Sequence, residues 1–271
     1  MKNVRTFKKM KEDREKIVML TAYDYSSAKF AQAAGIDLIL VGDSLGMVIQ
    51  GYEDTLSVTL DDIIYHTRAA RRGASDTFIV ADLPFMSYHL SLEDTKENAA
   101  LCIVDGGANA VKLEGGKASR IEAIKAIRDC EIPVVAHLGL TPQSIHALGG
   151  YAIQGKKKAD FELLQKQALA VQEAGAFMLV LEGIPEQLGK EISESLSIPT
   201  IGIGAGRFTD GQVLVYHDIL GMSGLEPKFL KIYANLSQTI TESIKTYFED
   251  VKNGSFPSAE HVYNPVGANE K

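Results

Sequence analysis

Residues 78–115, FIVADLPFMSYHLSLEDTKENAALCIVDGGANAVKLEG, contain the unit from which the fold is predicted. Two short runs rich in apolar and β-branched residues, FIVAD and AVKLE, flank a segment that carries apolar residues three and four positions apart. Such a segment is typical of an amphipathic helix, and parallel strands need a crossover connection of this kind. The stretch therefore predicts a strand, a helix and a second, parallel strand.

The same alternation extends along the chain in both directions. It predicts eight strands, at 18–24, 37–43, 78–84, 110–115, 133–140, 177–183, 199–204 and 213–218. Helical spacing recurs at 59–72, 91–104, 119–129 and 160–174, and several of these segments begin with Ser, Thr or Asp caps. About eight residues join the last two strands, which is too few for a helix of ordinary length. One barrel helix is therefore expected to be missing or displaced.

Eight strands linked by helices favour an α/β fold, a single-domain (β/α)8 TIM barrel with an extra N-terminal helix. The 271 residues, 45% of them hydrophobic, are enough to bury one large core. An open, flavodoxin-like sheet is the competing architecture, but no break in the sequence separates a second half. We expect residues 1–271 to form one domain, with a poorly patterned tail from about residue 253.

Charge and composition exclude several classes of partner. The chain has 28 basic and 35 acidic residues, and a net charge of −7 repels nucleic acid and anionic membranes. It contains no run of roughly 18 apolar residues, the length that a membrane-spanning helix needs. A count of only two cysteines is typical of reduced thiols in a cytosol. We expect a cytoplasmic protein that binds neither nucleic acid nor membrane.

Acidic residues stand at or near the ends of six predicted strands, and the carboxyl ends of the strands form the active face of a parallel barrel. These residues are Asp24, Asp43, Asp82, Glu114, Glu182 and Asp218. Residues two apart in a strand share a face, so Lys112 points the same way as Glu114. If that face is the barrel interior, Glu114 converges with Asp43 and Asp82 from the two preceding strands.

Three carboxylates at such short range predict a metal site. They would repel one another and raise one another's pKa unless a cation joined them. An all-oxygen set suits Mg²⁺ or Mn²⁺ better than zinc. The alternative is that each acid caps the helix that follows it or faces the solvent, as acids at strand ends often do.

Glu182 is the best candidate for a general base. It ends the sixth predicted strand after the apolar run FMLVL, and a carboxylate that leaves such a run is partly desolvated and so better suited to proton abstraction. His137, near the end of the fifth strand, would donate a hydrogen bond to a substrate oxygen, or would be a buried histidine satisfied by backbone groups. The GIGAG stretch at 202–206 lacks the spacing of a dinucleotide loop. It forms either a phosphate or substrate cradle or a tight turn that allows close packing.

Four motifs occur together in this chain: GDSLGMV at 42–48, DLPF at 82–85, KLEGG at 112–116 and HLGLTPQ at 137–143. Their joint occurrence is specific, and from about Thr6 to Pro257 the chain resembles the ketopantoate hydroxymethyltransferase family. The resemblance implies a (β/α)8 barrel that assembles into homodecamers. It also implies transfer of the one-carbon unit of 5,10-methylenetetrahydrofolate to 3-methyl-2-oxobutanoate, giving ketopantoate in the first step of pantothenate and coenzyme A biosynthesis.

The resemblance also assigns roles by motif. It implies one Mg²⁺ per subunit on Asp43, Asp82 and Glu114, with Glu182 in LEGIP as the catalytic base. The residues implied to bind the 2-oxo acid are Asp43, Ser44, Asp82, Lys112 and His137. On this basis the acid would bind the metal through its keto and carboxylate oxygens, and the metal and Lys112 would hold the enolate oxygen.

Three alternatives remain open at this point. Lys112 would form a Schiff base in a metal-independent aldolase, although three nearby acids would hold its amine protonated. A metal-dependent 2-oxo acid lyase or aldolase of the phosphoenolpyruvate mutase/isocitrate lyase superfamily would share the barrel and the acidic metal site, although no KKCGH-like loop occurs. The third alternative is a barrel that binds a ligand without catalysis.

Overall fold

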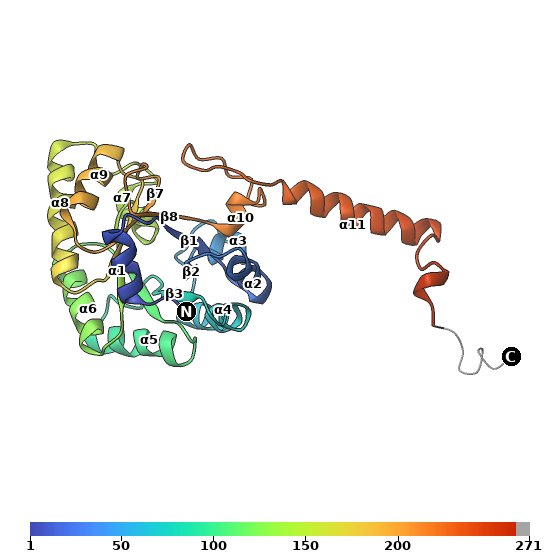
Figure 1. The fold of residues 1–271 in the computed structure, drawn as a ribbon, viewed down its shortest axis with the longest axis horizontal. Coiled ribbons are helices and arrows are strands. Elements are labelled where there is room, and N and C mark those ends of the chain that lie inside the picture. The colour runs from blue at the N-terminus through green and yellow to red at the C-terminus, as the bar shows by residue number, and fades with distance from the viewer. Residues whose placement is uncertain (264–271) are drawn as a thin grey trace. The chain divides into compact units, whose positions relative to one another are not determined.

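The computed structural model describes residues 1–263, so the part of the predicted tail at 264–271 lies outside the described residues. Eight parallel strands close into a barrel in sequence order (Figure 1). They are β1 Ile17–Thr21, β2 Leu38–Val41, β3 Phe78–Asp82, β4 Ala110–Glu114, β5 Val134–Gly139, β6 Met178–Glu182, β7 Thr200–Ile203 and β8 Gly211–Leu214. Closure comes from the pairing of β1 with β8, in which Ile17 lies opposite Gly211. The predicted (β/α)8 barrel is confirmed, and the open sheet is excluded.

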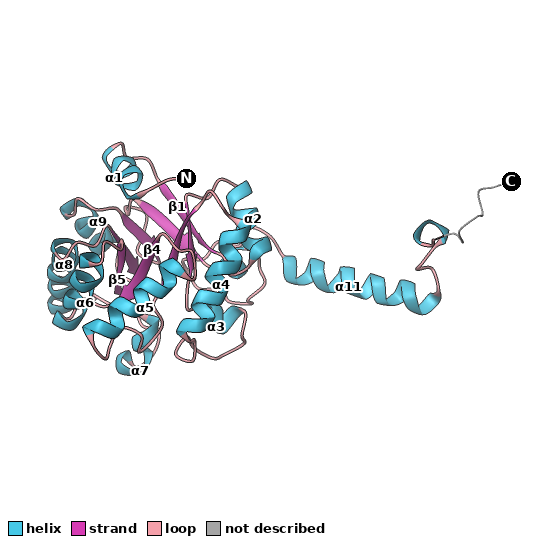
Figure 2. Cartoon of the chain, turned by 90° about the horizontal axis from the view of Figure 1, so that it is seen from below, coloured by secondary structure: helices cyan, strands magenta, loops and turns pink. Residues whose placement is uncertain are grey.

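Helices surround the strands (Figure 2). The helices of the barrel unit are α1 Val4–Glu12, α2 Tyr25–Ala33, α3 Leu45–Val48, α4 Leu60–Gly73, α5 Leu92–Val104, α6 Ala118–Asp129, α7 Ile145–Leu148, α8 Lys158–Glu173 and α9 Glu186–Ser195, with the short 3₁₀ turn η1 Pro142–Ser144. The chain continues with α10 Tyr216–Ile219, α11 Leu236–Asn253 and the 3₁₀ turn η2 Ala259–His261. The four helices predicted from spacing begin and end within two residues of α4, α5, α6 and α8. Caps explain this agreement, since Thr59 and Ser91 accept hydrogen bonds from the first turns of α4 and α5.

The last strand differs from the prediction. Strand β8 covers Gly211–Leu214 rather than 213–218, because the backbone N–H of Tyr216 donates to the side-chain hydroxyl of Thr21 instead of continuing the ladder. Asp218 therefore lies in the short helix α10, not at a strand end. The connection between β7 and β8, residues 204–210, contains no helix, so the predicted absence of one barrel helix is confirmed.

Helix α1, the predicted N-terminal addition, packs against the barrel core near the amino ends of the strands. Its apolar side chains Phe7 and Met10 are buried in the same cluster as Ile17 of β1 and Phe78 of β3. The rings of Phe7 and Phe78 meet edge to face at 5.2 Å between centroids, a favoured aromatic geometry. The interior at this end is therefore filled by side chains rather than open.

A polar clamp also joins α1 to the strand β7. Asp210 Oδ2 accepts hydrogen bonds from the backbone N–H and the hydroxyl of Thr200, at 2.8 and 2.9 Å. The same oxygen lies 2.6 Å from Lys11 Nζ, which also donates to the carbonyl oxygen of Ser193. One partly buried carboxylate thus satisfies groups from two elements.

We expect Asp210→Ala to lower the free energy of unfolding by about 1.5–3 kcal/mol, because the variant leaves a charged lysine and a strand N–H without their acceptor. Urea denaturation followed by circular dichroism measures the change. Glu122→Ala, which removes an exposed ion pair with Lys125 on α6, is the control and should change stability by no more than about 0.5 kcal/mol. Equal effects of the two substitutions would contradict this account of the clamp.

Among the described residues, 217–226 and 231–263 form a second compact unit, distinct from the barrel unit of 1–216 and 227–230. Its main element, α11, has no buried residue in this chain, and apolar side chains lie at helical spacing along one side. The organisation of 1–271 as one domain stays a prediction. Among residues 1–263, none of the helices combines the length and apolar character needed to cross a membrane.

Candidate active site

The carboxyl ends of β2, β3 and β4 bring three acids together in the barrel. Asp43 follows β2 directly, while Asp82 and Glu114 are the last residues of β3 and β4. All three are buried, with at most 4% of their surface exposed. Lys112, also buried, lies opposite Asp82 in the pairing of β3 with β4. The predicted convergence of these four residues is therefore present in the structure.

Lys112 is the charged centre of the cluster. Its Nζ lies 2.8 Å from Asp82 Oδ1, 3.7 Å from Glu114 Oε1 and 3.4 Å from His137 Nδ1. Burial by itself disfavours the ammonium ion, but the carboxylates of Asp82, Glu114 and Asp43 outweigh it and raise the pKa of Lys112. The amine therefore stays protonated at neutral pH, which argues against a Schiff-base nucleophile.

The three carboxyl groups have different environments. Burial and then the neighbouring charges of Asp82 and Glu114 raise the pKa of Asp43 well above its usual value. Burial also raises the pKa of Asp82, although Lys112 opposes that shift. Glu114 behaves differently: burial disfavours its charge, but contacts with His137, Lys112 and Gln143 together lower its pKa. The cluster thus holds more negative charge than Lys112 alone neutralises.

His137, in β5, links this cluster to the candidate base. Its Nδ1 lies 3.3 Å from Glu114 Oε1 and its Nε2 lies 3.3 Å from Glu182 Oε2, the last residue of β6. Burial and Lys112 favour the neutral ring, but the contacts with Glu114 and Glu182 prevail and raise the pKa of His137 to about 9. Both ring nitrogens face carboxylates rather than backbone groups. The Glu182 side chain is 17% exposed and so has access to a ligand.

Ser44 stands beside Asp43 at the start of α3. Its hydroxyl makes no capping hydrogen bond and lies 2.8 Å from the hydroxyl of Tyr23. Two other strand-end acids do not join the cluster. Asp24 caps α2 by accepting hydrogen bonds from the backbone of Ser26 and Ser27, and Asp218 belongs to α10 in the second unit. Asp24 is therefore a helix cap and not a ligand of the predicted metal site.

Two buried residues of the site were not predicted, Gln143 and Tyr88. Gln143 donates from its side chain to Asp43 and from its backbone to Glu114. Tyr88 donates to Gln143 and accepts the backbone N–H of Glu114. The sequence did contain a signal for both residues, because Gln143 lies in the HLGLTPQ motif and Tyr88 closely follows the DLPF motif. Both residues lie in the connections that follow strands, Gln143 in the 3₁₀ turn η1, and there the periodicity of apolar residues does not predict which way a side chain points.

The donor set fits a divalent cation, although no group of three Asp, Glu, His or Cys residues within 1–263 is arranged as a complete ligand set. Asp82 Oδ1 is buried and accepts no hydrogen bond of good geometry, even though Lys112 lies close. Three buried carboxylates are opposed here by one permanent cation, and hard oxygen donors suit Mg²⁺ or Mn²⁺. The residues that would hold such an ion are Asp43, Asp82 and Glu114.

The glycines at 202–206 allow close packing. A Cβ on Gly202 would lie 2.7 Å from the hydroxyl of Thr209, and one on Gly206 would lie 2.4 Å from the side chain of Glu186. Gly204 and Gly206 also have positive φ angles, which L side chains rarely adopt. These contacts favour the tight-turn alternative over a ligand cradle.

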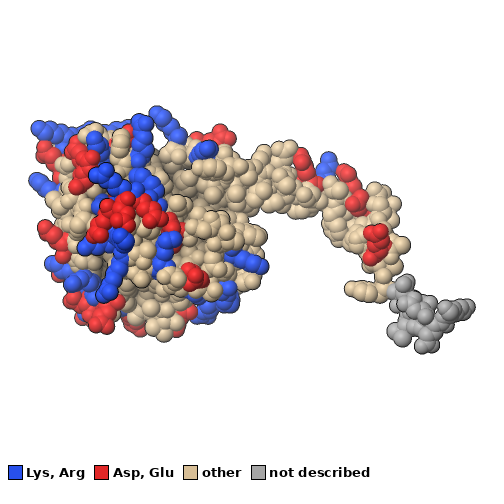
Figure 3. Space-filling model, in the orientation of Figure 1, with Lys and Arg blue, Asp and Glu red and all other residues tan. Residues whose placement is uncertain are grey.

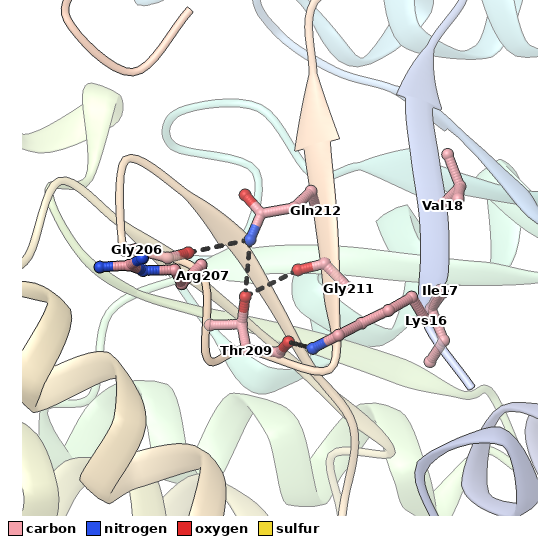
Figure 4. A pocket seen from close by; sticks show the side chains of 8 residues that line it. All are labelled: Lys16, Ile17, Val18, Gly206, Arg207, Thr209, Gly211 and Gln212. Carbon is pink, nitrogen blue, oxygen red and sulfur yellow. Dashed lines mark hydrogen bonds between the residues drawn. The ribbon is translucent and has the colours of Figure 1, made fainter. Parts of the chain in front are cut away.

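A cavity of about 380 Å³ lies at the opposite ends of the strands (Figure 4). It is lined by Lys16, Ile17, Val18, Gly206, Arg207, Thr209, Gly211 and Gln212. Within it, Lys16 Nζ donates to the carbonyl oxygen of Thr209, and Gln212 donates to Thr209 and Gly206. Lys16 and Gly211 stand at the amino ends of β1 and β8, so this cavity is separate from the carboxylate cluster. On the barrel face in Figure 3, acidic and basic side chains alternate without a patch of one sign.

Residues 1–259 match the family model described as ketopantoate hydroxymethyltransferase. The 3-methyl-2-oxobutanoate hydroxymethyltransferase of Bacillus subtilis (strain 168) is 55% identical over 265 residues, 97% of this chain and 95% of that protein. The enzyme of the same name from Clostridium beijerinckii (strain ATCC 51743 / NCIMB 8052) is 53% identical over 97% of this chain and 96% of its own length.

Solved structures share the fold at low identity. The structure of 2,3-dimethylmalate lyase, a PEP mutase/isocitrate lyase superfamily member, matches with a TM-score of 0.62 and 15% identity, over 96% of this chain and 91% of that one. Phosphonopyruvate hydrolase in complex with oxalate and Mg²⁺ matches with a TM-score of 0.59 and 14% identity, over 98% and 93% of the two chains. At these identities the likeness concerns the barrel alone.

Proposed function

Because the chain belongs to the ketopantoate hydroxymethyltransferase family, we propose that its barrel cluster forms the enolate of 3-methyl-2-oxobutanoate and that this carbon takes the one-carbon unit of 5,10-methylenetetrahydrofolate. The product is ketopantoate, the first intermediate specific to pantothenate and coenzyme A biosynthesis. The observation that carries the proposal is the placement of Glu182 across His137 from three buried carboxylates and Lys112. The family match favours this reaction over the lyase alternative, for which the solved structures support only the fold.

The proposed metal ligands are Asp43, Asp82 and Glu114, and one Mg²⁺ per subunit would balance their charge. When bound, the ion supplies a Lewis acid that draws electron density from the keto group of a 2-oxo acid and acidifies the adjacent C–H. The buried Asp82 Oδ1, which lacks a hydrogen bond of good geometry, and the raised pKa of Asp43 support this assignment, since Lys112 is the lysine that three buried carboxyl groups share.

Protein groups carry out the proton transfer and position the substrate. Glu182 takes the C3 proton, and the electron pair of the broken C–H bond moves toward the keto oxygen. Lys112 stabilises the negative charge that develops there, because neighbouring carboxylates keep its ammonium charged. His137 holds Glu182 in orientation, and Ser44 donates a hydrogen bond to the substrate carboxylate. Carbon C3 then forms a bond to the one-carbon unit, whose two bonds to folate nitrogens break. Water supplies the hydroxyl oxygen of the product, and the proton taken from C3 together with one proton of that water ends on the two nitrogens, which releases tetrahydrofolate.

The substrate and cosubstrate follow from the family, and so does the place of action in the cytoplasm. The names of the relatives specify 3-methyl-2-oxobutanoate as their substrate. The carboxylate cluster is buried and compact, which suits a small substrate such as the enolate of a 2-oxo acid, with one charge on its enolate oxygen and one on its carboxylate. The folate cosubstrate needs a second surface beside this cluster, from which its one-carbon unit can reach carbon C3 of the substrate.

Purified protein incubated with 3-methyl-2-oxobutanoate, tetrahydrofolate, formaldehyde and Mg²⁺ should form ketopantoate, detected by mass spectrometry. A chelator should abolish product formation, and added Mg²⁺ should restore it, because the carboxylate cluster needs a cation to bind the oxo acid productively. A protein that consumes the oxo acid without folate and yields a cleavage product would favour the lyase alternative. Product formation in the presence of a strong chelator would contradict the metal assignment.

The proposal includes self-association, as a homodecamer by family resemblance. Helix α11 supports association because its apolar side is exposed in the single chain. The exposed apolar residues are Ile240, Ile244, Tyr247, Phe248 and Val251. A helix with such a side normally buries it, and a second copy of the chain is the partner that is always present.

We expect Ile244→Asp to lower the molar mass measured by light scattering after size-exclusion chromatography, because a buried carboxylate without a partner disfavours the interface. Thr246→Asp adds the same charge on another side of α11 and serves as the matched control. It should leave the mass unchanged. An Ile244→Asp protein with the wild-type mass would show that this side of α11 is not an interface.

A further inference from the structure

Gln143 lies between the carboxylates that follow β2 and that end β4. It is 5% exposed and belongs to the turn η1 after β5. Its backbone N–H donates to Glu114 Oε2 at 3.1 Å, and its side-chain Nε2 donates to Asp43 Oδ2 at 2.9 Å. One residue therefore binds two of the three clustered carboxylates at once.

Contacts with backbone groups determine which atom donates and which accepts in every hydrogen bond of the Gln143 side chain. Its Nε2 also lies 3.0 Å from the carbonyl oxygen of Leu83, and a carbonyl can only accept, so the amide nitrogen must face Leu83 and Asp43. The hydroxyl of Tyr88 accepts the N–H of Glu114 at 3.2 Å, and its single proton is donated to Gln143 Oε1. Both donors and the acceptor of the amide are thus used.

This arrangement selects one oxygen of each carboxylate. Gln143 holds Asp43 Oδ2 and Glu114 Oε2, and so leaves the second oxygen of each carboxylate to other partners. Glu114 Oε1 faces the cationic side of the cluster, near His137 and Lys112. A buried carboxylate with one oxygen fixed in this way loses the freedom to rotate and presents its second oxygen in a fixed direction.

We propose that Gln143 is a positioning residue, which holds Asp43 Oδ2 with its side chain and Glu114 Oε2 with its backbone N–H and so fixes the orientation of both carboxylates for the divalent cation. Tyr88 in turn holds the Gln143 amide. The inference rests on the proposed function, because it assigns Gln143 to the metal site of that reaction. Without the side-chain amide, Asp43 would have to be ordered when the ion binds, and the turn whose backbone N–H holds Glu114 would lose its anchor, so metal affinity would fall.

The test uses Gln143→Leu in the full chain, since leucine keeps most of the volume and removes all three side-chain hydrogen bonds, while the backbone N–H that binds Glu114 is kept. Calorimetric titration of MgCl₂ into chelator-treated protein should show a Kd about 10- to 100-fold higher than that of the wild type. In turnover, the Mg²⁺ concentration for half-maximal rate should rise by the same factor, while saturating Mg²⁺ restores most of kcat. Gln165→Leu is the matched control, because it removes a hydrogen bond between a glutamine and Glu191 on the outer helices. It should leave the Kd for Mg²⁺ unchanged.

Tyr88→Phe is the second variant and decides the question if Gln143→Leu fails to fold. It removes one hydroxyl and keeps the ring, which lies 5.0 Å from the guanidinium carbon of Arg120. A raised Kd for Mg²⁺ with a melting temperature near that of the wild type supports the proposal. Wild-type affinity in every folded variant overturns the role of Gln143, as does an equal loss in Gln165→Leu. A wild-type protein that binds no Mg²⁺ overturns the metal site of the proposed function itself.

Discussion

Replacing Glu182 with glutamine is expected to slow loss of the C3 proton of 3-methyl-2-oxobutanoate by about 10²- to 10⁴-fold, the usual worth of a general base. Glutamine keeps the shape of the side chain and a polar contact with His137, but it does not accept the proton. Binding of the oxo acid should persist, since Lys112, Ser44 and the carboxylate cluster are unchanged. Exchange of the C3 proton in D₂O, followed by NMR, gives the rate, and calorimetry gives the affinity.

Glu186→Gln is the matched control, because Glu186 lies four residues further on at the start of α9 and pairs with the exposed Arg207. Its exchange rate should equal that of the wild type. If Glu182→Gln exchanged the proton at the wild-type rate, another group would have to be the base. A complete loss of oxo acid binding would instead make Glu182 a binding residue.

Lys112→Met is expected to lower the free energy of unfolding by about 3–5 kcal/mol, because removal of one partner from a buried ion pair leaves the other charge uncompensated. Lys112 is 3% exposed and lies 2.8 Å from Asp82, so solvent cannot replace its charge. Catalysis should fail as well, since the ammonium is the protein's own positive charge beside the developing enolate. Urea unfolding in the presence of a chelator measures the stability of the protein without metal.

Lys125→Met removes an exposed lysine that pairs with Glu122 on α6 and should change stability by no more than about 0.5 kcal/mol. A loss below about 1 kcal/mol for Lys112→Met would mean that the buried acids are neutral when the lysine is absent and that the ion pair contributes little. Borohydride treatment with substrate adds a further check, because a protonated Lys112 forms no adduct.

The alternation of strands and helices was sufficient to predict the barrel, because apolar periodicity reports burial directly. The predicted strand ends also identified the layer in which Asp43, Asp82 and Glu114 meet. Asp24 also stands at a predicted strand end but was not part of that group, and it takes the alternative role of a cap, because its chain turns at once into helix α2. The end of β8 was misplaced because a side-chain acceptor on β1, Thr21, ended the ladder.

Gln143 and Tyr88 show what periodicity does not supply. Each lies in a loop at the carboxyl end of a strand, and each reaches the cluster through hydrogen bonds between segments far apart in sequence. Their partners depend on how the loops after β3 and β5 fold across the barrel mouth. Only the three-dimensional structure reveals that one residue, Gln143, binds two carboxylates, Asp43 through its side chain and Glu114 through its backbone N–H.

The central claim is that this cluster generates an enolate with Glu182 as base. The most direct test follows the C3 proton of 3-methyl-2-oxobutanoate in D₂O by NMR, with and without Mg²⁺ and before addition of tetrahydrofolate and formaldehyde. The account predicts exchange that requires both Mg²⁺ and Glu182, followed by ketopantoate when the one-carbon donor is added. Absence of exchange in the wild-type protein with Mg²⁺, whether or not folate is present, would contradict it.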